Sequence, residues 1–210
     1  MFCIAAFIFC SCNNNGQSAK TFCDTTCNND SLKFTGDQKF KQTLVITKKD
    51  CKPDSVSRSF EGSDIVMKAP FSNYVSGDIH LNKSATAVAF EDTVSAWLSF
   101  NDCITGRGYL LEFPFQKGKT GIARNDALNS FDKKFSVDPD LRAYTDRGNI
   151  FVVNVTNGKT EMMTFKDNYA DMDFNDIHKT LDSINVTKNR IYVKLLKNGK
   201  EVPLEKNINL

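Results

Sequence analysis

The chain has 210 residues, of which 40% are hydrophobic, so it is long enough for one domain with a substantial core. Its 27 Lys and Arg balance 25 Asp and Glu, and the two signs are interspersed without a basic block. Nucleic-acid binding is therefore not expected. The 17 Phe, with many Val, Ile and Thr, favour β structure over disorder.

The first element is an apolar run at residues 2–9, FCIAAFIF, which suits the hydrophobic part of a signal peptide and is far too short to span a membrane. The run leads through Cys10 and Ser11 to Cys12, and this stretch resembles the lipobox of bacterial lipoproteins. In that motif the cysteine sulfur takes a diacylglycerol and becomes the first residue of the mature chain. Lipidation at Cys10 would place bulky Phe9 before the cut, so Cys12 is the predicted site.

The lipobox resemblance implies that residues 1–11 are a lipoprotein signal peptide. It departs from the pattern because no Lys or Arg precedes the apolar run. The alternative is an apolar N-terminal strand buried in the domain. Residues 12–31 are polar and poor in aliphatic side chains, so they are predicted to be a tether between the anchor and a folded part.

Short strands recur from Leu32 onward, and residues 32–210 are predicted to form a single β-rich domain. Alternating or apolar segments predict strands at 40–48, 63–69, 77–82, 86–90, 93–100 and 109–115. Two hairpins are predicted where Asn157-Gly158 and Asn198-Gly199 separate apolar runs, because Asn-Gly suits a type I′ turn.

Two short helices are also predicted, at 173–183 and at 125–131. In the first, Phe174, Ile177 and Leu181 share one helical face. The predicted fold is mainly β, with β-sandwich-like antiparallel sheets and one or two short helices. An α+β fold is the alternative.

Four cysteines remain after the signal peptide and Cys12 are set aside, namely Cys23, Cys27, Cys51 and Cys103. In an exported chain an even number predicts two disulfides, here favoured over free thiols. A zinc site is disfavoured because paired C-x2-C spacings are missing. Of the three connectivities, Cys23 with Cys27 and Cys51 with Cys103 is narrowly preferred.

No catalytic constellation, cofactor site or metal site is predicted. The acidic segment at 171–182 resembles a calcium loop, but Asp176 stands where that loop needs glycine, and helix capping explains its acids. His80 is expected to face solvent or end a strand, and Trp97 to be buried in the core rather than to stack on a sugar. A carboxylate pair for glycoside hydrolysis is defined by its distance in the fold, so no spacing in the sequence identifies it. The acids considered for that chemistry are Glu112, Asp126, Asp132, Asp138 and Asp140.

A tripeptide of Asp, then Ser or Thr, then a small or aliphatic residue or Thr recurs more often than the roughly one occurrence that composition predicts. It looks like the O-glycosylation acceptor motif of Bacteroidetes. Asp before Ser or Thr also suits turns and caps, and the two interpretations stay open. The candidate acceptors are Thr25, Ser31, Ser55, Thr93 and Ser183.

The body of the chain resembles uncharacterised lipoproteins of the same phylum in CDTTC, KFTGD, AWLSFNDC, GRGYLLEFPF, AYTDRGNIFV and LDSINVTKNRIYVK. The resemblance implies an anchored envelope protein and brings no activity. We therefore expect a lipid-anchored protein of the bacterial cell envelope, with the outer membrane favoured. It would be a binding or assembly module with an envelope protein or a glycan as partner. The alternatives are a secreted hydrolase acting on glycans and a structural envelope component without a ligand.

Overall fold

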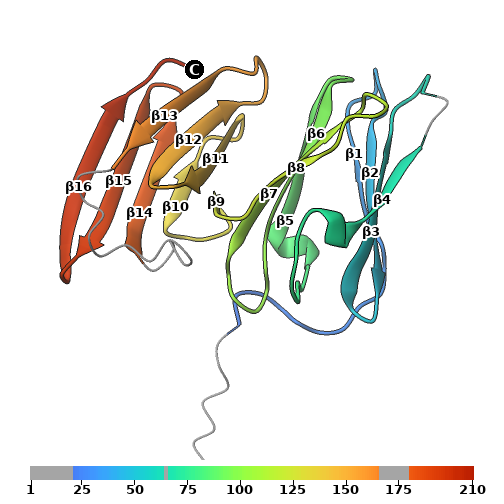
Figure 1. Cartoon of the computed structure of the whole chain (residues 1–210), viewed down its shortest axis with the longest axis horizontal. Helices are drawn as coiled ribbons and strands as arrows, with labels where there is room; N and C mark the ends of the chain where they lie inside the picture. The colour runs from blue at the N-terminus through green and yellow to red at the C-terminus, as the bar shows by residue number, and fades with distance from the viewer. Residues whose placement is uncertain (1–20, 64–65, 166–179) are drawn as a thin grey trace, which may run out of the picture.

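The chain forms a mainly β structure of four sheets, each of four strands, in a computed structural model that describes residues 21–63, 66–165 and 180–210. The predicted β-sandwich-like class is thereby confirmed. Figure 1 shows the sheets arranged as two packed pairs that lie side by side. Cys12, residues 173–179 and most of the acidic 171–182 segment lie outside the described residues.

The first pair of sheets, here the first sandwich, follows the N-terminal segment. One sheet has the order β1-β2-β3-β4 and the other β5-β6-β7-β8, with every neighbouring pair antiparallel. The strands are β1 (Leu32–Thr35), β2 (Thr43–Lys49), β3 (Lys52–Ser59), β4 (Met67–Pro70), β5 (Thr86–Glu91), β6 (Ser95–Asn101), β7 (Gly108–Pro114) and β8 (Ile122–Arg124).

The second sandwich contains the rest of the described chain. Its sheets have the orders β13-β12-β11-β9 and β10-β14-β15-β16, and β10 pairs with β14 in parallel. The strands are β9 (Ala127–Leu128), β10 (Phe135–Val137), β11 (Leu141–Asp146), β12 (Asn149–Asn154), β13 (Thr160–Thr164), β14 (Leu181–Thr187), β15 (Arg190–Lys197) and β16 (Lys200–Asn207).

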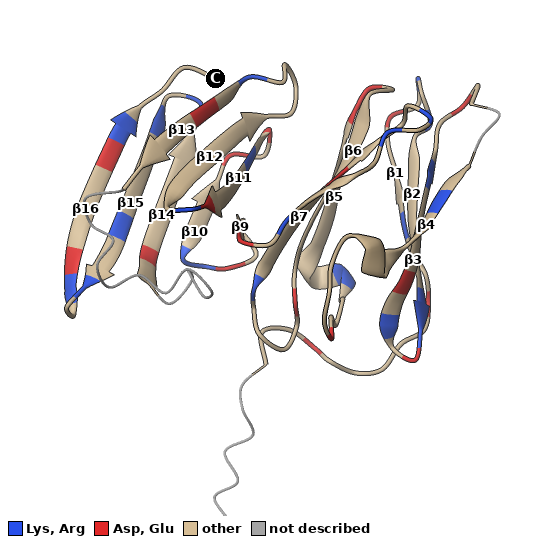
Figure 2. Cartoon of the chain, viewed as in Figure 1, with Lys and Arg blue, Asp and Glu red and all other residues tan. Residues whose placement is uncertain are grey.

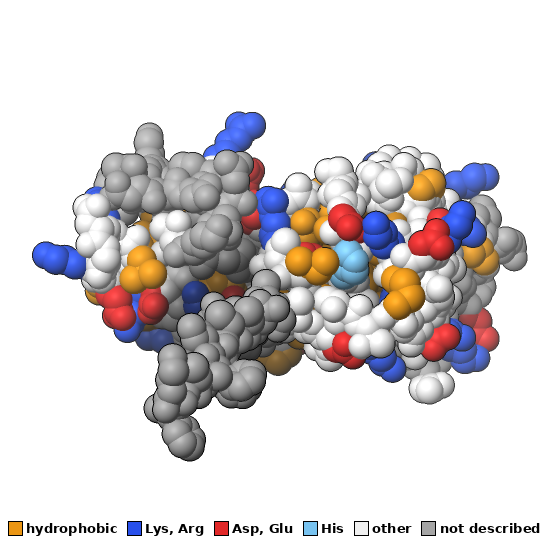
Figure 3. Space-filling view, turned by 90° about the horizontal axis from the view of Figure 1, so that it is seen from below, with side chains coloured by type: hydrophobic (Ala, Val, Ile, Leu, Met, Phe, Trp, Pro, Cys, Tyr) orange, Lys and Arg blue, Asp and Glu red, His pale blue; other side chains and the backbone are white. Residues whose placement is uncertain are grey.

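Each sandwich has its own hydrophobic core, because alternate residues of its strands point between its two sheets. Leu44, Leu98 and Phe113 are fully buried in the first core, and Ile150 and Val193 in the second. The limits of the predicted single domain stay a prediction. Charged side chains of both signs are interspersed over both sandwiches (Figure 2) and over the face shown in Figure 3.

Most predicted strands are confirmed, at β2, β4, β5, β6 and β7, as are both predicted hairpins, β12–β13 and β15–β16. Asn198 and Gly199 both have positive φ and join β15 to β16 directly. At the other hairpin only Gly158 has positive φ, because residues 155–159 form a longer loop closed by the Asn154 amide donating to the Lys159 carbonyl.

Two element predictions are wrong, the helix at 125–131, which contains strand β9, and the strand at 77–82. The predicted helix at 173–183 lies mostly outside the described residues, and its last three residues belong to β14. The helical spacing of Leu181 and Ile184 does not produce a helix there, because both residues reach the second core from strand β14. That strand is irregular between Leu181 and Ser183. Residues 77–82 form no strand. Two short 3₁₀ segments are described, η1 (Phe71–Asn73) and η2 (Lys83–Ala85).

A strap of residues 21–31 crosses the lower end of the first sandwich (Figure 1) and carries two disulfides. Cys23 pairs with Cys103 and Cys27 with Cys51, with Cα separations of 4.6 and 5.1 Å. The preferred pairing is therefore wrong, although two disulfides are confirmed. The reason is that each cysteine of the strap lies beside a turn of the first sandwich, Cys23 beside the turn that contains Cys103 and Cys27 beside the β2–β3 turn that contains Cys51.

Hydrogen bonds also hold the strap against the sandwich. The Phe22 amide donates to the Cys103 carbonyl at 2.7 Å, and Asn82 Nδ2 donates to the Asp24 carbonyl at 3.0 Å. The Cys51 amide donates to Asn29 Oδ1 at 2.8 Å. The second half of the predicted tether is thus attached to the sandwich, and only the part before residue 21 stays a predicted tether.

Candidate functional site

One wall of the candidate site is the outer face of the β5–β8 sheet. Alternate residues of β6, such as Leu98, point into the first core, so Trp97 points to the opposite face. Trp97 lies opposite Glu112 of β7, and Glu112 lies opposite Ile122 of β8. This register places an aromatic ring, a carboxylate and an aliphatic side chain in one row across the sheet.

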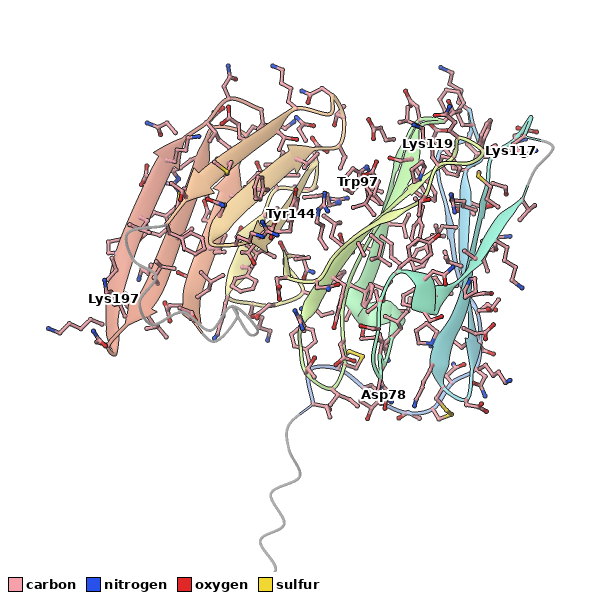
Figure 4. All side chains as sticks on the ribbon, in the orientation of Figure 1. Asp78, Trp97, Lys117, Lys119, Tyr144 and Lys197 are labelled. Carbon is pink, nitrogen blue, oxygen red and sulfur yellow. A yellow bond between two sulfur atoms is a disulfide. The ribbon has the colours of Figure 1, made fainter. Side chains whose placement is uncertain are left out.

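The other wall belongs to the second sandwich. Tyr144 of β11 stacks on Phe151 of β12, with ring centroids 5.3 Å apart. The guanidinium carbon of Arg124, on β8, lies 4.9 Å from the centre of the Tyr144 ring and so connects the two walls. Figure 4 shows Trp97 and Tyr144 on facing sides of the space between the sandwiches.

The space between these walls, here called the cleft, has a volume of about 340 Å³. That volume is at the lower end of the range of small-molecule sites. Val94 and Ile122, which line the cleft, are 58% and 42% exposed. The lining residues are Glu91, Val94, Trp97, Leu110, Glu112, Ile122, Arg124, Tyr144, Val153, Asn154, Gly158 and Thr160.

Two carboxylates of the cleft have different surroundings. Glu91 Oε2 accepts hydrogen bonds from Ser95 Oγ at 3.0 Å and from Trp97 Nε1 at 3.3 Å. These bonds hold the Trp97 indole against the sheet. Partial burial raises the pKa of Glu112, the negative charge of Glu91 raises it further, and the positive charge of Arg124 opposes both effects.

The joint between the sandwiches fixes the width of the cleft. Arg107, before β7, donates from Nε to the Asn125 carbonyl at 2.8 Å, and its Nη2 lies 3.0 Å from Asp126 Oδ1. Gly108 approaches the Ala127 carbonyl so closely that a Cβ on Gly108 would clash with its oxygen. A hydrogen bond of 2.6 Å from Asn129 Nδ2 to Asn101 Oδ1 adds a second side-chain link.

The five acids considered for glycoside hydrolysis do not converge. Only Glu112 lines the cleft. Asp126 is part of the joint, and Asp140 pairs with the Lys188 ammonium at 2.8 Å on the surface. Asp138 lies in a separate hollow beside β10, and Asp132 accepts from the Lys134 amide in a loop.

The preferred interpretation of Trp97 as a core residue is wrong, since the side chain is half-buried and lines the cleft. The reason is that its neighbours at 96, 98 and 100 fill the core from the other face of β6. His80 is also half-buried and lies in a loop. Its backbone amide donates to Asp102 Oδ1 at 2.9 Å.

The candidate glycosylation acceptors differ in accessibility. Thr25 and Ser31 are exposed in the strap, and Thr93 is half-buried in the β5–β6 turn. Ser183 is half-buried in β14. Ser55 is only 5% exposed within β3, where its hydroxyl and that of Thr47 lie 2.7 Å apart.

The sequence did not single out Glu91, Arg124 or Tyr144. They lie on three strands, and only the packing of one sandwich beside the other brings them together. The one available signal was the alternation of residues 93–100, which places Trp97 on the weakly polar face of its strand.

Among the described residues no group of three His, Cys, Asp or Glu side chains could hold a metal ion. No helix in the described ranges is long and apolar enough to cross a membrane. The fold defines a protein of two β-sandwiches with a cleft between them, and its disulfides indicate a location outside the cytoplasm. No family model, curated protein or solved structure matches the chain.

Proposed function

We propose that this protein is a lipid-anchored binding module of the bacterial cell envelope and that its cleft binds a glycan. The observation that carries the glycan proposal is the pair of aromatic side chains, Trp97 and Tyr144, on facing walls of one cleft. Aromatic faces pack against the apolar faces of sugar rings, and carboxylate, amide and hydroxyl groups bind sugar hydroxyls. Asn154 and Thr160 supply the neutral polar groups.

The envelope location is supported by the two disulfides and by the lipobox-like stretch before Cys12. Replacing Cys12 with Ala is expected to abolish palmitate labelling and membrane retention, whereas Cys10→Ala keeps both. The reverse result would assign the lipid to Cys10. Fractionation of the envelope of the native host tests the outer-membrane proposal, and the intact mass of the same protein tests sugars on Thr25 and Ser31.

Glycan binding is tested by calorimetry of the purified mature protein against envelope oligosaccharides. Trp97→Ala and Tyr144→Ala are each expected to weaken binding by about five- to thirtyfold, since a lost aromatic contact removes on the order of 1 to 2 kcal/mol. Tyr192→Ala is the matched control, because Tyr192, like Tyr144, has an arginine over its ring but does not line the cleft. The Arg190 guanidinium carbon lies 5.6 Å from the Tyr192 ring centre. Equal losses in all three variants would refute the cleft as the site.

A second candidate function, glycoside hydrolysis, is favoured by one observation. Glu91 and Glu112 both line the cleft, the raised pKa of Glu112 suits a proton donor, and hydrogen bonds from Ser95 and Trp97 hold the Glu91 carboxylate in place. Release of new reducing ends from a bound oligosaccharide, lost in both Glu112→Gln and Glu91→Gln, would establish this activity. Binding without any cleavage would leave the protein a binding module.

A further inference from the structure

We propose that the cleft selects glycans that carry a free amino group over their neutral N-acetylated counterparts. This inference rests on the proposed glycan-binding function and adds the charge of the ligand to it. The cleft walls present two carboxylates, Glu91 and Glu112, beside the indole of Trp97, and one guanidinium, that of Arg124. When both carboxylates are ionised, the charged groups of the cleft walls therefore carry a net charge of −1.

The single guanidinium is already engaged on the opposite wall. Arg124 lies over the Tyr144 ring, and in the described parts of the chain neither carboxylate is within ion-pair distance of a Lys or Arg. Glu112 is also partly desolvated, so its negative charge is costly where no cation lies beside it. A ligand that brings a cation would reduce this cost, whereas a neutral sugar would not.

An ammonium group fits the chemistry of this wall. It has three donors for carboxylate oxygens, and charge-assisted hydrogen bonds are stronger than neutral ones. A cation over an indole is attracted by the negative face of the ring. An acetamido group at the same place carries no charge and offers one donor. The aromatic walls hold the sugar ring in both cases, and the two carboxylates select the amine.

The pH dependence follows from the groups that face Glu112, which are Glu91 on β5, Arg124 on β8 and Tyr144 on β11. The ligand ammonium requires Glu112 ionised, so binding releases a proton when Glu112 is protonated beforehand. Affinity for the amino glycan therefore increases as pH rises through the pKa of Glu112, and falls again when the ligand amine loses its proton. The neutral glycan shows no increase of this kind.

The test compares two chito-oligosaccharides of equal length, one fully N-acetylated and one fully de-N-acetylated, by calorimetry at slightly acidic pH. The amino form is expected to bind about tenfold tighter or more, from the extra charged hydrogen bonds. Glu91→Gln and Glu112→Gln should each reduce this ratio several-fold, because each lowers the affinity for the amino form more than the affinity for the acetylated form. Glu205→Gln, on the exposed face of β16, is the matched control for non-specific attraction.

The possible results separate the two proposals. Equal or tighter binding of the acetylated form leaves the glycan-binding function standing and overturns the selection for an amine. Preference for the amino form that Glu205→Gln reduces as much as Glu112→Gln also overturns it, because the attraction would then be general. Binding of neither form overturns both. A retained thermal unfolding midpoint in both cleft variants shows that altered binding is not a folding defect.

Discussion

The Cys27–Cys51 disulfide stabilises the first sandwich by restricting the unfolded chain, and its removal has a calculable effect. The two cysteines are 24 residues apart, and the chain-entropy relation for a loop of this length gives about 3.5 kcal/mol before any native strain. Cys27 is exposed and Cys51 half-buried, so replacement of both by Ser removes little packing. The double variant should lose approximately this free energy of unfolding.

Urea unfolding under oxidising conditions measures the loss as a lower transition midpoint at similar slope. The matched control is the effect of a reducing agent on each protein. Reduction breaks two disulfides in the wild type and one in the double variant, so it should lower the free energy of unfolding more in the wild type. A double variant within about 1 kcal/mol of wild type would refute the entropic reasoning.

Peptide mapping tests the connectivity itself. Trypsin places Cys23 and Cys27 together in peptide 21–33, so the observed pairing joins this peptide to the two that contain Cys51 and Cys103. A local Cys23–Cys27 bridge would leave peptide 21–33 on its own. Cleavage before Asp24 separates Cys23 from Cys27 and identifies which partner each one has.

Three further predictions concern the turn, the joint and the cleft. Asn198→Ala should lower the free energy of unfolding by about 1 to 2 kcal/mol in a urea titration, because position 198 has φ +51°, and Asn157→Ala should cost less, having no positive φ. Gly108→Ala should cost about 1 to 3 kcal/mol through overpacking against the Ala127 carbonyl, and a thermal midpoint equal to wild type would contradict this. Glu112→Gln should flatten the pH dependence of stability. The folded protein raises the pKa of Glu112, so protonated Glu112 favours the folded state. This contribution is complete below the ordinary pKa of 4.5 and is lost as the pH rises through the folded-state pKa. Parallel pH curves for variant and wild type would show that Glu112 is not desolvated.

The hairpins show how far local sequence predicts this fold. Asn198-Gly199 predicts a two-residue turn because both residues tolerate positive φ, and the structure has it. Asp50-Cys51 forms an equivalent turn between β2 and β3, with φ values of +51° and +66°. Cysteine has no preference for positive φ, so the sequence does not predict this turn. That turn presents the Cys51 sulfur to the strap, so the turn and the disulfide depend on each other.

The sequence by itself determined the β class, most strands and the presence of two disulfides, because these follow from composition, from the cysteine count and from alternation along single strands. The tertiary structure decided the pairing of the cysteines, the division into two cores and the cleft. The physical reason is that these features join residues far apart in the chain. Trp97, Glu112 and Tyr144 become neighbours only because sheet register and the Gly108 joint place one sandwich against the other.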